Sequence, residues 1–141
     1  MKVHITRQIP DLAMTMLQKR GYAVTMGSAT SPSRTELLKA VQGVDAILSV
    51  LTEHIDAEVM DVAGKQLKIV ANYAVGFDNV DVVTAKARGI AVTNTPVSVV
   101  SEAVAEHTMS LIMALAHRIC EGNAYAKAEK YQGWDPLLLL G

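Results

Sequence analysis

Short apolar runs alternate with segments of helical spacing over the first 97 residues, and this alternation constrains the fold more than any other feature. The apolar runs show little polar alternation and lie at residues 3–6, 22–26, 45–50, 67–71 and 90–92. The segments between them place apolar side chains three and four positions apart, at residues 10–20, 34–42, 56–63 and 80–88. A glycine follows each of these segments and favours the end of a helix there.

Strands separated by single helices predict right-handed crossovers and therefore a parallel sheet. The continuous hydrophobicity of the runs indicates strands covered on both faces. We predict an α/β domain over residues 1–97, a flavodoxin-like, doubly wound, five-stranded parallel sheet with strand order 2-1-3-4-5. Ser31 or Ser33 is the expected N-cap of the second helix, and Asp56 that of the third.

A different pattern begins at Ser101 and defines a second segment, residues 98–141. It predicts one long helix to about Ala128, with a weak point at Gly122. The helix is apolar around most of its circumference, so it must be buried against another domain or another subunit. Residues 97–120 also carry Glu102 and Arg118 among other polar groups, and this polarity argues against a membrane span.

The net charge, the cysteine content and the N-terminal sequence indicate which kinds of partner and compartment to expect. The chain has 141 residues and a formal net charge of −1, so no basic surface field recruits nucleic acid. Its single cysteine, Cys120, excludes an internal disulfide and suits a reducing compartment. The N-terminus leads directly into a strand pattern, without an apolar leader run. We expect a cytoplasmic protein with no nucleic-acid or membrane partner.

Ligands of doubly wound sheets bind beyond the carboxyl ends of the strands, here residues 6–8, 51–54, 72–79 and 94–96. The loop 72–79 is the most informative, because Gly76 permits close approach and successive backbone N–H groups can cradle a carboxylate. Asp78 and Asn79 could cap the helix that follows. On local grounds alone, a plain capped turn is the favoured interpretation. Arg7 could meet an anion, although a solvated arginine is the simpler alternative.

Several other kinds of site are disfavoured. The chain contains no G-x-G-x-x-G motif, no glycine-rich phosphate loop after the first strand and no acidic cluster there. We expect His4 in the sheet and His54 on the surface. His107 and His117 fall about 80° apart on a helix, so they do not form a metal pair. Cys120 is interpreted as a packing residue, and no metal site is expected.

Three stretches carry a family resemblance: residues 72–81 (NYAVGFDNVD), 88–96 (RGIAVTNTP) and 102–107 (EAVAEH). In this order and spacing they resemble the D-isomer-specific 2-hydroxyacid dehydrogenases. The first two are most similar to glyoxylate and hydroxypyruvate reductases, and the third is also similar to D-lactate dehydrogenases. The resemblance extends over nearly the whole chain.

The resemblance implies a two-domain enzyme in which the long helix begins a Rossmann domain for NAD or NADP and forms a homodimer contact through residues 101–120. It implies that the backbone N–H groups of Val75 and Gly76 hold the substrate carboxylate. Leu51 and Thr52 would border the substrate, and Val75 and Val104 would approach the nicotinamide. Many family members have threonine where this chain has Val104.

Tyr73 and Asn79 would shape the substrate loop, and Asp78 would fix it. Residues 134–141 match the family segment that precedes the dinucleotide-binding strand. The sequence contains neither the family's phosphate-binding loop nor its catalytic arginine, acid and histidine, so no catalytic residue is assigned.

Our leading hypothesis is therefore the N-terminal portion of an oxidoreductase that moves a hydride between NAD(P)H and a small 2-oxo or 2-hydroxy acid, such as glyoxylate or hydroxypyruvate. We expect this portion to be inactive alone. A stand-alone dimerisation or interaction module is the alternative from another class. A small-anion binder that uses only the Val75–Gly76 loop is a third.

Overall fold

The computed structural model describes residues 1–138 and divides the chain into two compact units, Met1–Pro96 and Val97–Gly141. Residues 139–141, which end both the predicted second segment and the family-like stretch 134–141, lie outside the described residues. Each unit is described by itself.

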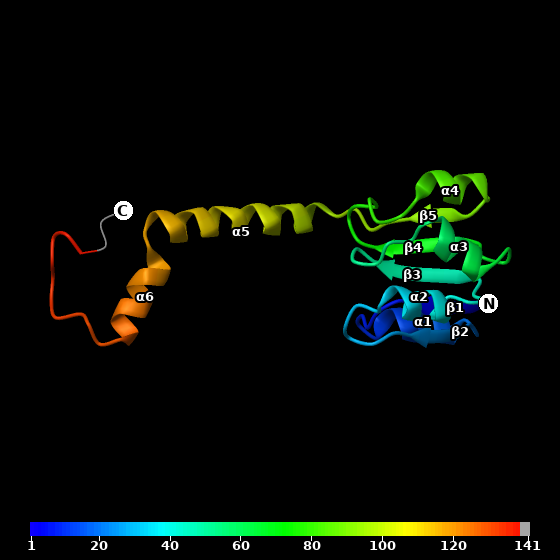
Figure 1. Ribbon diagram of the computed structural model, residues 1–141, viewed down its shortest axis with the longest axis horizontal. Helices are drawn as coiled ribbons and strands as arrows, with labels where there is room; N and C mark the ends of the chain where they lie inside the picture. The colour runs from blue at the N-terminus through cyan, green and yellow to red at the C-terminus, as the bar shows by residue number, and fades with distance from the viewer. Residues whose placement is uncertain (139–141) are drawn as a thin grey trace. The chain divides into compact units, whose positions relative to one another are not determined.

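The first unit is built on a five-stranded sheet in which every strand pairing is parallel. Its strands are β1 (Lys2–Ile5), β2 (Ala23–Met26), β3 (Ala46–Val50), β4 (Ile69–Tyr73) and β5 (Ala91–Thr93). Their order is β2-β1-β3-β4-β5 (Figure 1), which confirms the predicted topology. Strand β1 is central to one half of the sheet, because it pairs with both β2 and β3.

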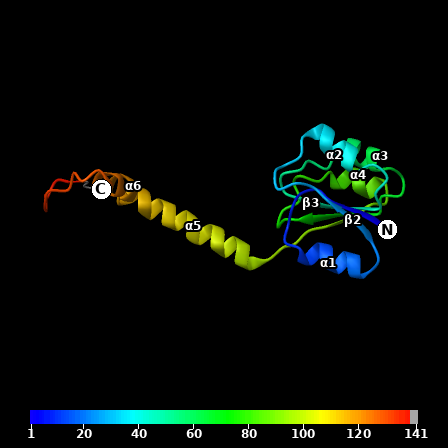
Figure 2. The ribbon, with the colours of Figure 1, turned by 90° about the horizontal axis from the view of Figure 1, so that it is seen from below.

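Four helices connect the strands: α1 (Leu12–Lys19), α2 (Arg34–Ala40), α3 (Ala57–Ala63) and α4 (Val82–Ala87). Figure 2 shows α1 on one side of the sheet and α2, α3 and α4 on the other. The prediction that the strands are covered on both faces is therefore met only in part. Helix α1 buries none of its own residues, although Val3 and Ile5 of β1 are buried outside the cluster described next.

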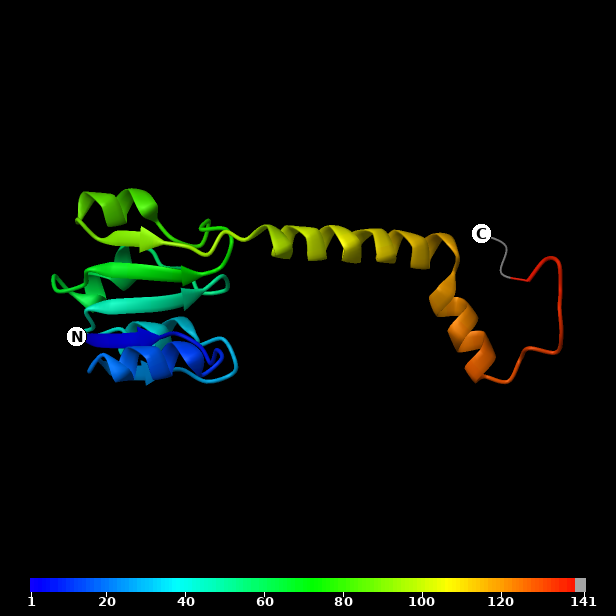
Figure 3. The ribbon, with the colours of Figure 1, turned by 180° about the vertical axis from the view of Figure 1, so that it is seen from behind.

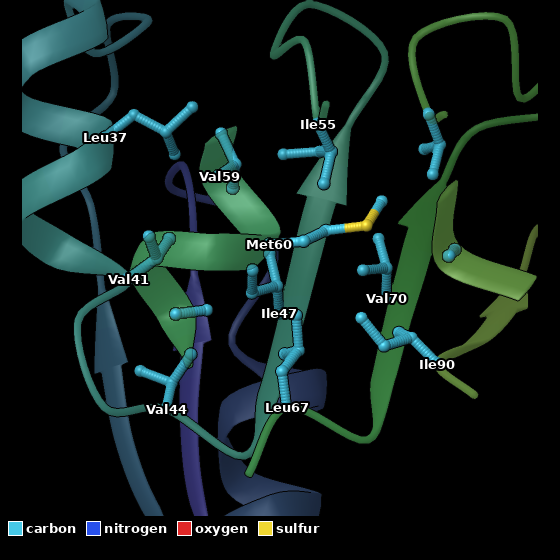
Figure 4. Packing of buried hydrophobic residues seen from close by; sticks show 13 residues of the cluster. Leu37, Val41, Val44, Ile47, Ile55, Val59, Met60, Leu67, Val70 and Ile90 are labelled. Carbon is cyan, nitrogen blue, oxygen red and sulfur yellow. The ribbon is translucent and has the colours of Figure 1, made fainter. Parts of the chain in front are cut away.

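The hydrophobic core lies between the sheet and the three helices α2, α3 and α4 (Figure 4). Ile47, Ile55 and Val70 at its centre are fully buried. A buried aliphatic side chain of this size stabilises the fold by about 1.5–3 kcal/mol. The cluster also contains Leu37, Val41, Val44, Val59, Met60, Ala63, Leu67, Val80, Ala85 and Ile90.

Cap residues explain where the helices of this core begin. Ser33 is the N-cap of α2 and forms a reciprocal capping box with Glu36, so the expected serine cap is confirmed at Ser33. Asp56 caps α3 as predicted, by accepting a 3.1 Å hydrogen bond from the amide of Val59. These short-range bonds satisfy N–H groups that the first turn of a helix leaves without a partner.

Arg34 links the N-termini of α2 and α3. Its guanidinium donates to both carboxylate oxygens of Asp56, at 2.7 and 2.8 Å, and also to Glu58. Burial by itself would raise the pKa of Asp56, but the hydrogen bonds from Arg34 and from the amide of Val59 outweigh it and lower the pKa.

The start of α4 differs from the prediction. Asp81, rather than Asp78 or Asn79, is the N-cap, and its carboxylate accepts a 2.9 Å hydrogen bond from the amide of Thr84. The expected helical start at residue 80 is wrong because Val80 forms a parallel bridge with Ile55 and remains extended. Hydrogen bonds from the Thr84 hydroxyl, at 2.6 Å, and then from the Thr84 amide lower the pKa of the Asp81 carboxyl.

The second unit contains α5 (Ser98–Ala116) and α6 (Ile119–Lys127) instead of one continuous helix. The predicted weak point at Gly122 is wrong, because the amide of Gly122 donates to the Arg118 carbonyl inside α6. The break lies at Arg118, whose backbone is left-handed with φ of 50°. The Arg118 side chain pairs with Glu121 in the first turn of α6 and so supports the new helix.

Helix α5 has no buried residue in this structure. Among residues 1–138, it is the helix that is long and apolar enough to cross a membrane, by length and composition only, with a mean hydropathy of 1.3. Residues 97–120 were expected to be too polar for a membrane span. The observed helix passes the test for a membrane span because it ends before Arg118. Its only formally charged residues are Glu102 and Glu106. Core helices of soluble proteins pass the same test.

Candidate functional site

The carboxyl ends of the parallel strands meet at one edge of the first unit, where the strand arrows of Figure 3 end. The predicted residues Leu51, Thr52, Val75 and Gly76 follow β3 and β4, which are neighbours in the sheet. Sheet topology therefore brings four of the five predicted binding residues to the same edge.

The loop that contains Val75 and Gly76 is held by its carbonyl groups. The side-chain amide of Asn94 donates to the Val75 carbonyl at 2.6 Å, and that of Asn72 donates to the Gly76 carbonyl at 3.0 Å. Within residues 1–138, the amide N–H groups of Val75 and Gly76 donate to no protein acceptor. Two adjacent, exposed donors on an anchored loop are suited to binding a carboxylate.

Thr95, in the segment after β5, anchors the same loop. Its amide donates to the Ala74 carbonyl at 2.9 Å, and its hydroxyl donates to the same oxygen at 3.1 Å. The loop after β4 is therefore fixed to the segment after β5 at successive residues, as pre-organisation of a binding site requires.

A polar network under this edge is centred on Asn79. Its side-chain nitrogen donates to the carbonyls of Val50 at 3.1 Å and Glu53 at 2.9 Å, while its oxygen accepts from Asn72 at 2.9 Å. Asn72 in turn accepts from the buried hydroxyl of Ser49 at 2.8 Å. Asn79 therefore joins the loop after β3 to the loop after β4, which agrees with its expected role in shaping the loop.

Glu53 lies in the candidate range 51–54, but no role of its own was predicted for it from the sequence. Its side chain is buried, and its carboxylate accepts hydrogen bonds from the hydroxyls of Thr6 at 2.8 Å and Thr52 at 2.7 Å. The amide of Val50 donates to the same carboxylate at 3.2 Å. The one signal in the sequence was an acidic residue shortly after a buried strand.

Thr52 is exposed, and its hydroxyl is oriented by Glu53 on one side and by Arg7 on the other. Arg7 donates to the Thr52 hydroxyl at 3.3 Å and to the Ala29 carbonyl at 3.0 Å. A pocket of about 390 Å³ opens beside these groups. It is lined by Arg7, Gln8, Ile9, Pro10, Ala29, Val50, Leu51 and Tyr73.

Val104, the remaining predicted binding residue, lies on α5 in the second unit and is 61 % exposed. His54, His107 and His117 are exposed, and residues 1–138 contain no cluster of His, Cys, Asp or Glu able to hold a metal. His4 is buried in β1 with its Nδ1 2.8 Å from the Thr25 hydroxyl, and this burial lowers its pKa.

The chain was compared with known protein families. Residues 3–132 match the family model described as D-isomer specific 2-hydroxyacid dehydrogenase, catalytic domain. Glyoxylate reductase from Thermococcus litoralis is 41 % identical over 144 residues, which cover 99 % of this chain and 43 % of the relative. The chain thus spans less than half the length of this relative.

Solved structures agree with the fold. The crystal structure of TT0316 protein from Thermus thermophilus superposes with a TM-score of 0.90 at 44 % identity, covering 100 % of this chain and 45 % of that one. D-lactate dehydrogenase from Aquifex aeolicus, solved in complex with NAD and lactic acid, shares the fold at 21 % identity and a TM-score of 0.76. In that case the match covers 98 % of this chain and 40 % of the other.

The family model matches most of the chain. The parallel sheet places the predicted substrate loops at one edge. Both findings agree with the family resemblance that the three sequence stretches carry. The chain belongs to the D-isomer specific 2-hydroxyacid dehydrogenase family.

Proposed function

We propose that this chain forms the substrate side of an NAD(P)H-dependent reductase site for small 2-oxo acids such as glyoxylate or hydroxypyruvate. The observation that carries this proposal is the loop after β4, in which the carbonyls of Val75 and Gly76 are bonded while both amide N–H groups remain available. These two donors bind the substrate carboxylate. Leu51 and Thr52, on the loop after the neighbouring strand, border the rest of the substrate.

NAD or NADP is the proposed cofactor of the whole protein, and its reduced nicotinamide supplies the hydride. The residues of this chain fit only the nicotinamide end. The side chains of Val75 and Val104 are apolar and exposed, as contact with a ring requires, whereas the sequence has no G-x-G-x-x-G loop for the phosphates. Nor is an acid–base residue assigned, so these 141 residues alone are expected to give no turnover.

Carboxylate binding can be tested directly on the 141-residue chain by following backbone amide resonances during titration with glyoxylate or its analogue oxalate. We expect the largest shifts at Val75 and Gly76, because these N–H groups gain a charged acceptor. Uniform or absent shifts at these two residues, in a folded chain, would contradict the proposal.

Gly76→Ala provides the matching variant. A methyl group at this position meets only the Asp78 carboxylate at 3.6 Å, an ordinary contact, so the fold should accept it. The methyl group would crowd a ligand that approaches the backbone, and we expect at least a tenfold loss of oxalate affinity. Asn123→Ala, at an exposed position in the second unit, is the control and should leave the affinity unchanged.

A second proposed role is self-association through residues 101–120. The observation in its favour is the large apolar area of α5, where Val104, Met109 and Leu115 are each more than half exposed. Such a surface is typical of an interface rather than of a solvated helix. This role is compatible with the reductase proposal, since the same helix would form a homodimer contact in the whole protein.

A further inference from the structure

The pocket beside Leu51 has one charged residue, Arg7, among its lining residues. Two of the five donor hydrogens of Arg7 are used, one by the Ala29 carbonyl and one by the Thr52 hydroxyl. Within residues 1–138, Arg7 forms no ion pair with an acidic side chain. The Glu53 carboxylate forms no ion pair with Arg7, but it accepts a hydrogen bond from the Thr52 hydroxyl, the same group to which Arg7 donates. Arg7 therefore brings a positive charge to the pocket, together with donor hydrogens that no protein acceptor within residues 1–138 uses.

The position of Arg7 relates this charge to the proposed carboxylate loop. Arg7 follows β1, and its side chain reaches Thr52 on the loop after β3, the next strand in the sheet. Strand β4, which leads into Val75 and Gly76, is the strand after that, at a spacing of about 4.8 Å. Arg7 and the Val75–Gly76 loop therefore lie at the same edge of the sheet, with the Thr52 loop between them. A ligand that reaches both needs an anionic group at each end.

We propose that this pocket is a second subsite, in which Arg7 binds a distal carboxylate of the substrate while the Val75–Gly76 loop binds the carboxylate next to the oxo group. Among small 2-oxo acids, the preferred substrates are then those that carry a second carboxylate. Leu51 and Tyr73 cover the methylene groups between the two ends. This inference rests on the proposed function, because it uses the same loop for the first carboxylate.

The test compares 2-oxoglutarate with 2-oxopentanoate, which has the same five-carbon chain and oxo group but no distal carboxylate. Both are titrated into the 141-residue chain, with amide resonances at Arg7, Val75 and Gly76 as the readout. We expect 2-oxoglutarate to bind about tenfold more tightly and to shift Arg7 as well as the loop. Arg7→Gln should remove this difference while leaving the affinity for 2-oxopentanoate intact.

Two variants complete the design. Arg7→Lys keeps the charge without the forked geometry and should retain part of the preference for the diacid. Arg20→Gln removes an exposed arginine at the end of α1 and should leave the preference unchanged. A sulfate titration gives the effect of an anion that has no carbon chain, and should shift Arg7.

The outcomes separate the two proposals. If 2-oxopentanoate shifts Val75 and Gly76 but 2-oxoglutarate binds no better, the subsite is wrong and the proposed function stands. If neither acid shifts the loop, both are wrong, even where 2-oxoglutarate perturbs Arg7 as sulfate does. Equal preference for the diacid in wild type and in Arg7→Gln would also overturn the role of Arg7.

Discussion

At the scale of single residues, the side-chain amide of Asn79 connects its own loop to strand β4 and to the end of β3 with the loop that follows it. It donates to the carbonyls of Val50 and Glu53 and accepts from Asn72. Removing a side chain of this kind leaves several partly buried polar groups without a partner, and each such group is costly. The network is therefore a structural support for the loops after β3 and β4.

Asn79→Ala is expected to lower the free energy of unfolding by about 2–4 kcal/mol, because it breaks these hydrogen bonds without burying new apolar surface. Urea denaturation followed by circular dichroism measures the change. The same substitution at exposed Asn123 should alter stability by less than about 0.5 kcal/mol. Equal effects at the two positions would show that the network contributes nothing to stability.

His4 makes the first unit sensitive to pH. Burial lowers its pKa in the folded state, whereas the unfolded chain has the ordinary value of about 6.5. The unfolded state therefore takes up a proton first as the pH falls, and stability that is fully present above pH 6.5 is progressively lost below it. We expect the free energy of unfolding to decrease between about pH 7.5 and pH 5.

His4→Gln removes the titrating group and should flatten this pH dependence, while exposed His117→Gln should keep the wild-type slope. Denaturant midpoints measured at several pH values across this range are sufficient. A wild-type slope in His4→Gln would assign the effect to other groups.

Local signals explain which residues of the first unit were predictable. Ser33 and Asp56 were expected as caps, because a cap bonds only to residues of its own first turn. Asp81 was missed, since the choice between it and Asn79 depends on the pairing of Val80 with the distant Ile55. Glu53 was missed for the same reason, because its partner Thr6 comes from another strand.

At the scale of elements, α5 and α6 show where periodicity stops being informative. The apolar spacing continues through residues 101–128, and glycine was the only conventional helix breaker in that range. The structure keeps Gly122 helical and turns the chain at Arg118, where the αL backbone is accompanied by the pair with Glu121. Nothing in the residue types before Arg118 marks this turn in the sequence.

The exposed apolar side chains of α5 should cause association of the chain in solution. Ile112→Lys and Leu115→Lys each place a charge where apolar surface would be buried. Each is expected to weaken association at least tenfold. Sedimentation equilibrium over a range of concentrations measures the constant.

The matched control is Leu12→Lys, which changes an equally exposed apolar residue on α1 and should leave association unchanged. A monomeric wild-type chain, or equal weakening by Leu12→Lys, would show that α5 is not the contact.

At the scale of the whole molecule, sequence reasoning recovered the sheet because connection handedness leaves few ways to arrange alternating strands and helices. The strand order and the parallel pairing are confirmed. The sequence did not predict that α1 lies on one face of the sheet while α2, α3 and α4 lie on the other. An apolar run such as residues 67–71 has the same appearance whether helices cover one face of the strand or both.

The site shows the same division. Val75 and Gly76 are predicted from a motif that is contiguous in the chain, and their binding role stays a prediction. The contacts of Arg7 and Glu53 join loops far apart in sequence. Position at the carboxyl end of a strand was enough to name a candidate edge. The hydrogen bonds that anchor this edge could be assigned only from the fold.

Helix α1 should open more easily than the sheet of the first unit, because none of its residues is buried. Amide hydrogen exchange proceeds through local openings whose free energy follows the burial of each segment. Helix α1 buries no residue, while β1 and β3 lie against fully packed side chains. Helix α1 therefore exchanges through fraying that leaves the sheet intact, whereas the amides of β3 exchange only when the whole unit unfolds.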